Sequence, residues 1–201
     1  MKIRFISILV LAFGLTMVSC KEDKKEQTET TITEEVKSDA PKVAYEPTQE
    51  DINKAASVMA KLMLTKECSQ FSSYLVTAEL TDMLFYESGP YTVFAVTNDA
   101  IMGLGSDINK NLAQRAKVDS LATMLKGHIV AGNFDTVKLV QELKSGPVKL
   151  KTLAGTQLTI TKKGSDLLVK DAQGKSATIG KSDIKGGNGV LHLVDAFLGE
   201  R

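Results

Sequence analysis

The chain has 201 residues, of which 43% are hydrophobic and 24% charged, and its formal net charge is +1. That length accommodates one domain with additional segments, or two very small domains. Nucleic-acid-binding proteins carry a strong basic excess, so the near-zero charge argues against a dedicated nucleic-acid binder, and the absence of tryptophan argues against stacking platforms for sugars or bases.

The first residues predict an export signal. Two basic residues precede Phe5–Val18, an apolar stretch of 14 residues, which is shorter than the ~20 residues of a membrane-spanning helix and typical of a signal peptide. Cys20 follows almost directly, and the junction resembles a bacterial lipobox with Met17 where leucine is usual. The resemblance implies that residues 1–19 are a lipoprotein signal peptide and that Cys20 is lipidated. The alternative is an ordinary cleaved signal followed by a chance cysteine.

The next segment predicts a tether. Residues 21–50 contain five lysines and nine acidic residues, and such a composition cannot bury enough apolar surface to offset the entropy of ordering. We therefore expect residues 20–48 to form a lipidated cysteine followed by a flexible acidic stalk. Lys21-Glu22-Asp23 resembles an export tag of some Gram-negative surface lipoproteins, although it is also explained as the start of the stalk. With acyl chains such as palmitate holding the protein, the expected location is the cell envelope, at the surface of the outer membrane.

Residues 49–201 predict a folded domain whose first half is helical. Apolar residues recur at helical spacing over 52–64, and again from Phe71 to Met83, before Gly89-Pro90. Tyr91–Val96 predicts a strand, Thr97 a helix cap, and residues 107–126 a further helical stretch.

The second half of the domain predicts strands. Four short apolar runs are separated by turn residues, and a final run, Gly189–Leu198, follows a glycine-rich turn. The four runs are Val148–Leu153, Thr156–Thr161, Leu167–Lys170 and Ala177–Ile179. Helices first and strands later, without βαβ alternation, indicate an α+β domain.

Four blocks of this domain resemble the signatures of the fasciclin domain family. They are Thr92-Val93-Phe94-Ala95-Val96-Thr97-Asn98-Asp99-Ala100, Leu125-Lys126-Gly127-His128-Ile129-Val130-Ala131-Gly132, Leu153-Ala154-Gly155, and Asp183-Ile184 with Asn188-Gly189-Val190-Leu191-His192-Leu193-Val194-Asp195. Their order and spacing cover nearly all of the domain. The resemblance implies a single fasciclin-like domain, a wedge-like β-sandwich with flanking helices, that serves as an adhesion module.

The sequence favours a protein that is not an enzyme. Cys68, His128 and His192 could form a nucleophilic pair in principle, but His192 lies within an apolar run and His128 within a block that serves packing in the family. Cys68 has no partner for a disulfide if Cys20 is lipidated. No metal-binding spacing or phosphate-binding loop occurs, so we expect no metal and no cofactor.

Two sets of residues are candidates for binding. Asp183 and Ile184 occupy the place of an Asp-Ile pair through which some animal fasciclin domains bind integrins, and His128 lies in the family's other integrin-binding block, where Gly127 replaces the usual tyrosine. The simpler explanation, which the sequence favours, is a turn acid and core side chains.

The second set is basic. Residues 138–185 hold ten lysines against four acids, and Lys162, Lys163 and Lys181 are candidates for contact with anionic glycans or an acidic partner. The lysines are also explained as the solvated face of a sheet.

Taken together, the sequence predicts a membrane-anchored cell-surface module that contacts proteins or glycans. The expected partners are the membrane, through the lipid anchor, and a surface protein or anionic glycan, and not nucleic acid. The alternative is a non-catalytic carrier or sensor of a small apolar ligand in the cell envelope, with a cavity lined by the methionines and leucines of the helical half.

Overall fold

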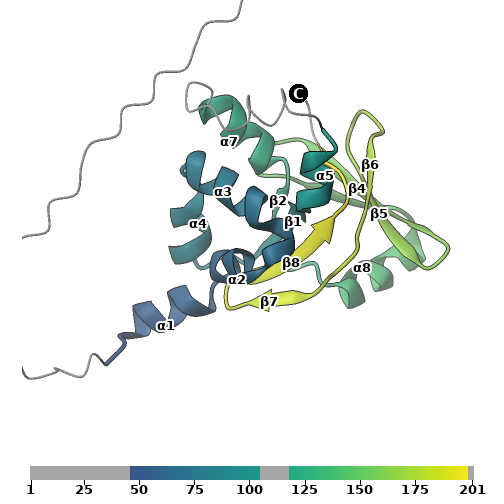
Figure 1. The fold of residues 1–201 in the computed structure, drawn as a ribbon. Helices are drawn as coiled ribbons and strands as arrows, with labels where there is room; N and C mark the ends of the chain where they lie inside the picture. Colours follow the sequence, from purple (N-terminus) through teal and green to yellow (C-terminus); the bar gives the residue numbers. More distant parts are fainter. Residues whose placement is uncertain (1–45, 105–117, 199–201) are drawn as a thin grey trace, which may run out of the picture. The chain divides into compact units, whose positions relative to one another are not determined.

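The computed structural model describes residues 46–104 and 118–198 (Figure 1). The predicted signal peptide, Cys20, the stalk as far as residue 45 and residues 107–117 of a predicted helical stretch lie outside the described residues. The helices are α1 (Gln49–Ala56), α2 (Val58–Leu64), α3 (Ser69–Thr77), α4 (Thr81–Tyr86), α5 (Asn98–Met102), α7 (Val118–Lys126) and α8 (Thr136–Glu142). The strands are β1 (Tyr91–Val96), β2 (Ile129–Ala131), β3 (Val148–Lys151), β4 (Gln157–Lys163), β5 (Asp166–Lys170), β6 (Ser176–Thr178), β7 (Ile184–Gly186) and β8 (Gly189–Val194). None of the described helices is both long and apolar enough to span a lipid bilayer.

The strands form two four-stranded sheets. Sheet A has the order β2-β1-β8-β7 and sheet B the order β3-β4-β5-β6. Consecutive strands of sheet B pair antiparallel, whereas β1 runs parallel to β8 in the centre of sheet A, with Tyr91 opposite Gly189 and Val96 opposite Val194. Two sheets with accompanying helices confirm the predicted α+β class.

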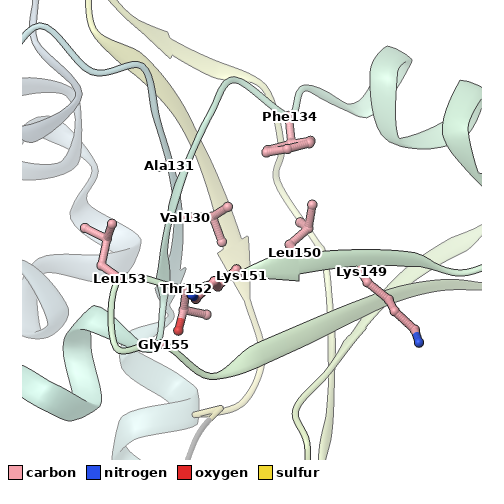
Figure 2. A pocket seen from close by; sticks show the side chains of 9 residues that line it. All are labelled: Val130, Ala131, Phe134, Lys149, Leu150, Lys151, Thr152, Leu153 and Gly155. Atoms are coloured by element: carbon pink, nitrogen blue, oxygen red, sulfur yellow. The ribbon is translucent and has the colours of Figure 1, made fainter.

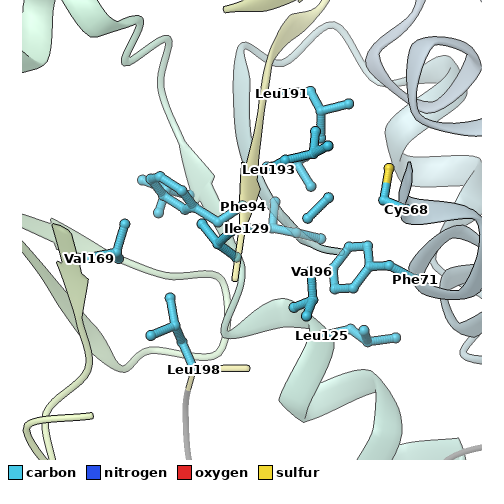
Figure 3. Close-up of a cluster of buried hydrophobic side chains, with 14 of the residues drawn as sticks. Cys68, Phe71, Phe94, Val96, Leu125, Ile129, Val169, Leu191, Leu193 and Leu198 are labelled. Carbon is cyan, nitrogen blue, oxygen red and sulfur yellow. The ribbon is translucent and has the colours of Figure 1, made fainter. Parts of the chain in front are cut away.

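The centre of sheet A is covered on both faces. All six residues of β1 are buried, as expected of strands that read as continuous apolar runs. Figure 3 shows Phe71 and Val96 on one side of β8, and Phe94 and Val169 on the other. Helices α2 and α3 and the inner face of sheet B therefore enclose the central strands in one hydrophobic core.

The predicted helix over 52–64 is interrupted at Ser57, so the prediction of one continuous helix is wrong. The Ser57 hydroxyl accepts a hydrogen bond of 3.2 Å from an N–H in the first turn of α2, which starts a new helix. The break frees one carbonyl and one N–H for the turn between β7 and β8. Gly187 N–H donates to the oxygen of Ala56 (2.7 Å), and Val58 N–H donates to Oδ1 of Asn188 (2.8 Å).

The side chain of Asn188 is buried and joins three segments. Besides accepting from Val58, its Nδ2 donates to the carbonyl oxygens of Leu84 (3.0 Å) and Glu87 (2.9 Å). These carbonyls lie at the C-terminal end of α4, where carbonyls lack partners within the helix. One amide thus holds the start of α2, the end of α4 and the β7–β8 turn together.

The second predicted helix, from Phe71 to Met83, is also two helices. Glu79 adopts a φ of 57°, and Leu80 N–H donates back to the oxygen of Leu75 (3.0 Å), which ends α3. The sequence does not predict β2, α8 or β7.

Candidate binding surface

His128 is fully buried between α7 and β2. Its Nδ1 donates to the carbonyl oxygen of Phe94 (2.9 Å), and its Nε2 accepts from the N–H of Leu198 (3.1 Å). Burial lowers the pKa of His128 to about 4, more than the hydrogen bonds raise it. The neutral ring therefore joins β1 to the residues after β8, and both of its nitrogens are occupied.

Asp183 is held by internal contacts as well. Its carboxylate accepts hydrogen bonds from the N–H (2.8 Å) and hydroxyl of Thr136, the first residue of α8, and its own N–H donates to Nδ1 of His192 (3.4 Å). Burial opposes ionisation of Asp183, but the bonds from Thr136 outweigh it and lower the pKa. His192 donates through Nε2 to the oxygen of Phe134 (2.8 Å). Ile184 is partly buried against the core, so the pair fastens α8 to β7.

The other two candidate reactive side chains, Cys68 and His192, are also buried. Cys68 is buried, and burial raises the pKa of its thiol to about 12, so it is not a thiolate nucleophile. Burial also lowers the pKa of His192. Over residues 46–104 and 118–198, no three His, Cys, Asp or Glu side chains gather where they could hold a metal ion.

The two adjacent candidate lysines point to opposite faces of sheet B. Successive side chains of a strand alternate between faces, and Lys163 follows Thr161 and Thr159 on the outer face, whereas Lys162 follows buried Ile160. Lys162 lies beside α8, at a surface depression of about 500 Å³.

Lys181 belongs to neither face. It forms a 3.0 Å ion pair with Glu67, and both side chains are about half exposed. The three candidate lysines therefore do not form one patch.

The outer face of sheet B does carry a group of lysines. Lys149 lies opposite Thr159, which lies opposite Lys170, so two lysines flank a threonine in one row across three strands. Lys151 and Lys163 lie on the same face, and Asp166 lies opposite Lys163. The remaining outward side chains are Gln157, Thr161, Leu168, Ser176 and Thr178. This set of outward side chains is called the open face below.

The sequence could have identified the open face more sharply. The excess of lysines over residues 138–185 points to this region. Choosing candidates by their closeness in the sequence, however, groups Lys162 with Lys163 and omits Lys149, Lys151 and Lys170. Counting every second residue along each strand separates the two faces.

Three of the surface depressions formed by the described residues bear on ligand binding. One of about 540 Å³ lies between β2 and β3 and is lined by apolar side chains and lysines (Figure 2). A second, of about 500 Å³, lies where β1 and β8 end, and the third is the one beside Lys162. None of the three is lined by Met59 or Leu62, which are buried in the core, so they give no support to a carrier whose cavity lies in the helical half.

Three relatives are similar to this chain along most of the folded part. Protein sll1483 of Synechocystis sp. is 33% identical over 121 residues, which is 60% of this chain and 61% of that protein. Periostin of Homo sapiens is 32% identical over 143 residues, 71% of this chain and 16% of periostin. Transforming growth factor-beta-induced protein ig-h3 of Sus scrofa is 31% identical over 147 residues, 71% of this chain and 19% of that protein. The chain thus spans about three fifths of the Synechocystis relative and less than a fifth of the two animal proteins.

A solved structure shares the fold. It is a FAS1 domain pair from the insect cell adhesion molecule Fasciclin I, with a TM-score of 0.65 and 18% sequence identity, and the match covers 72% of this chain and 51% of that one. The family model of the fasciclin domain matches residues 66–200. Helix α2 precedes this range, yet it contributes Val58, Met59 and Leu62 to the core. From this match, the four sequence blocks and the two-sheet fold, we conclude that the chain belongs to the fasciclin domain family.

Proposed function

We propose that this protein is a non-catalytic adhesion module, held at the cell surface by a lipid on Cys20, whose open face binds anionic glycans. The observation that carries the proposal is the row of Lys149, Thr159 and Lys170 on the open face, where Asp166 is the one acidic residue among the outward side chains of β3 to β6. The likeness to a domain pair of an insect cell adhesion molecule supports an adhesive role.

The geometry of the row suits a repeating anionic polymer. Neighbouring strands lie about 4.8 Å apart, so the backbones of Lys149 and Lys170 are about 10 Å from each other. Threonine and serine hydroxyls between the lysines can donate to sulfate, carboxylate or hydroxyl groups. Exposed lysines attract such a polymer over roughly a Debye length, so binding weakens as salt increases.

The glycan proposal is tested by charge reversal on the purified full chain. We expect the Lys163→Glu/Lys170→Glu variant to lose most of its affinity for a sulfated polysaccharide probe. Lys66→Glu/Lys185→Glu makes the same double reversal at two exposed lysines outside sheet B, and is the matched control. Equal losses at both places, or no salt-dependent binding by the unaltered chain, contradict the proposal.

The anchor is tested separately. The apolar stretch before Cys20 and the acidic segment after it support export followed by lipid attachment. We expect Cys20→Ala to move the protein from the membrane fraction to the soluble fraction. Retention of the variant in the membrane fraction contradicts the anchor and leaves the glycan proposal untouched.

A further inference from the structure

β3 is an edge strand of sheet B, and the N–H and C=O groups of every second residue point away from the sheet. Thr152 N–H donates to the oxygen of Thr156 (2.9 Å), in register with Lys151 opposite Gln157. Backbone groups alternate along an antiparallel strand, so Val148 and Leu150 direct their N–H and C=O toward β4. Lys149 and Lys151 direct theirs away from the sheet.

Within the part of the chain that the structure describes, only the end of this edge is covered. Leu153 N–H donates to the oxygen of Ile129 (2.8 Å), and a single bridge pairs Val130 with Thr152. Lys149 lies beyond the bridge, and none of the backbone or side-chain hydrogen bonds of the described residues uses its outward N–H or C=O.

The opposite edge of sheet B, on β6, differs from the β3 edge because its outward backbone groups are hydrogen-bonded within the domain. On β6, Thr178 N–H donates to Oδ1 of Asp195 (2.6 Å), and Asp195 N–H donates to the oxygen of Thr178 (3.3 Å). One residue after β8 thus occupies both outward backbone groups of Thr178, whereas none of residues 46–104 and 118–198 does the same for Lys149.

A depression lies beside the open edge, where β2 and β3 diverge. It has a volume of about 540 Å³. Figure 2 shows Val130 and Leu150 directed into the space between the strands, Phe134 at one end of it, and Lys149 directed away. The edge therefore has apolar side chains toward its inner side and lysines toward the open face.

We propose that the β3 edge binds an extended peptide segment of alternating apolar and acidic residues, which becomes a fifth strand of sheet B. Residues directly opposite each other in a sheet point to the same face. The peptide residue opposite Lys149 therefore points to the open face, where a carboxylate meets the ammonium groups of Lys149 and Lys151. Its two neighbours lie opposite Val148 and Leu150, and their apolar side chains enter the depression. Main-chain bonds then supply affinity, and the alternating side chains supply specificity.

A second copy of this chain fits the edge less well. Pairing of two β3 edges places the lysines of both copies on neighbouring positions of one face, where like charges destabilise the pair. Lysine on an edge strand and Pro147 directly before it are also devices that hinder self-association. The same lysines attract an acidic strand, and this inference does not depend on the glycan proposal.

The test uses the purified full chain and a short fluorescent peptide of alternating valine and glutamate. We expect saturable binding that falls about tenfold or more when the amide of the central glutamate is N-methylated, because one main-chain bond is lost. A peptide of the same composition with its valines and glutamates in separate blocks should bind equally poorly. If the N-methylated or block peptide binds as well as the alternating one, the edge proposal is overturned.

Two charge variants distinguish binding of the peptide at the β3 edge from general attraction to the lysines of the open face. Lys149→Glu and Lys170→Glu make the same change in the same row, but only Lys149 is on the edge. We expect Lys149→Glu to weaken peptide binding about tenfold and Lys170→Glu to weaken it only slightly. In the complex, exchange of the Lys149 amide hydrogen should also slow. Equal losses in both variants, or unchanged exchange at Lys149, overturn strand addition. If the unaltered chain binds the peptide but shows no salt-dependent binding of the polysaccharide, only the glycan proposal is overturned.

Discussion

Replacing Asn188 with alanine should remove a large share of the stability of the domain. The change deletes three hydrogen bonds of 2.8 to 3.0 Å and leaves the N–H of Val58 and the carbonyls of Leu84 and Glu87 without those partners. Each buried group left unsatisfied costs about 1–3 kcal/mol. Because groups within one network are not additive, and the Glu87 bond is only partly buried, we expect a total of about 3–5 kcal/mol.

Urea unfolding followed by circular dichroism measures this loss, which should appear as a lower midpoint at an unchanged slope. Thermal unfolding should shift down by about 10 °C for a domain of this size. The matched control is Asn133→Ala, since Asn133 is exposed and its replacement should change stability by less than about 0.5 kcal/mol. In the Asn188 variant the amide hydrogen of Val58 should exchange faster than the amides of β1.

The aspartate variant tests the direction of the bonds. Asn188→Asp keeps the acceptor for Val58 but places a second carboxylate oxygen against the carbonyls of Leu84 and Glu87. It should be at least as destabilised as alanine at neutral pH and should approach the unaltered chain on acidification, when the protonated carboxyl can donate. The reasoning is refuted if alanine costs less than about 1 kcal/mol, or if aspartate is tolerated at neutral pH.

Three further outcomes follow from the core. The pKa of His128 is about 4 in the folded chain, whereas an exposed histidine, as in the unfolded chain, has a pKa of 6.5. The unfolded state therefore binds the proton first as pH falls. Stability is then full above about pH 6.5 and declines by about 3 kcal/mol toward pH 4, and urea titrations should show a smaller decline in His128→Gln. Gly186→Ala should be strongly destabilising, since its Cβ would lie 2.5 Å from a backbone nitrogen of α2, whereas Gly187→Ala, whose nearest contact is 3.5 Å, should be mild; equal midpoints for the two would contradict the steric account. In the Cys20→Ala chain, Cys68 should react with a thiol reagent only on unfolding, and rapid labelling of the native chain would show that its thiol is accessible.

The strongest sequence patterns predicted the centre of the fold. Tyr91–Val96 and the run from Gly189 are almost entirely apolar because both strands are buried on two faces. The turn residues of the second half predicted the hairpins of sheet B, because a hairpin is formed by residues that are close together in the sequence.

Helix α8, which the sequence did not predict, buries little. Leu139 is the one buried residue of α8, so no apolar periodicity marks that helix. At Ser57 the apolar spacing continues across the break, and what ends α1 is a contact with the β7–β8 turn, far away in the sequence.

The binding surfaces required the order of the strands. Alternation along each strand separates Lys162 from Lys163 from the sequence alone. Lys149 lies on a strand edge because β3 is the first strand of sheet B and because β2 pairs with the end of β3 through one bridge only. Neither the strand order nor this bridge can be read from the sequence around Lys149.

The parallel pairing of β1 with β8 bears on how this chain acquires its structure as it is made. Ribosomes release the N-terminus first, so the apolar strand Tyr91–Val96 emerges well before Gly189–Val194, its central partner. The hairpins of β3 to β6 can close from neighbouring residues in the interval, whereas sheet A requires contacts between distant parts of the chain, which form slowly. A chain cut short before β8 would present β1 as an exposed apolar strand, so the last few residues of the domain decide whether the whole becomes soluble or aggregates.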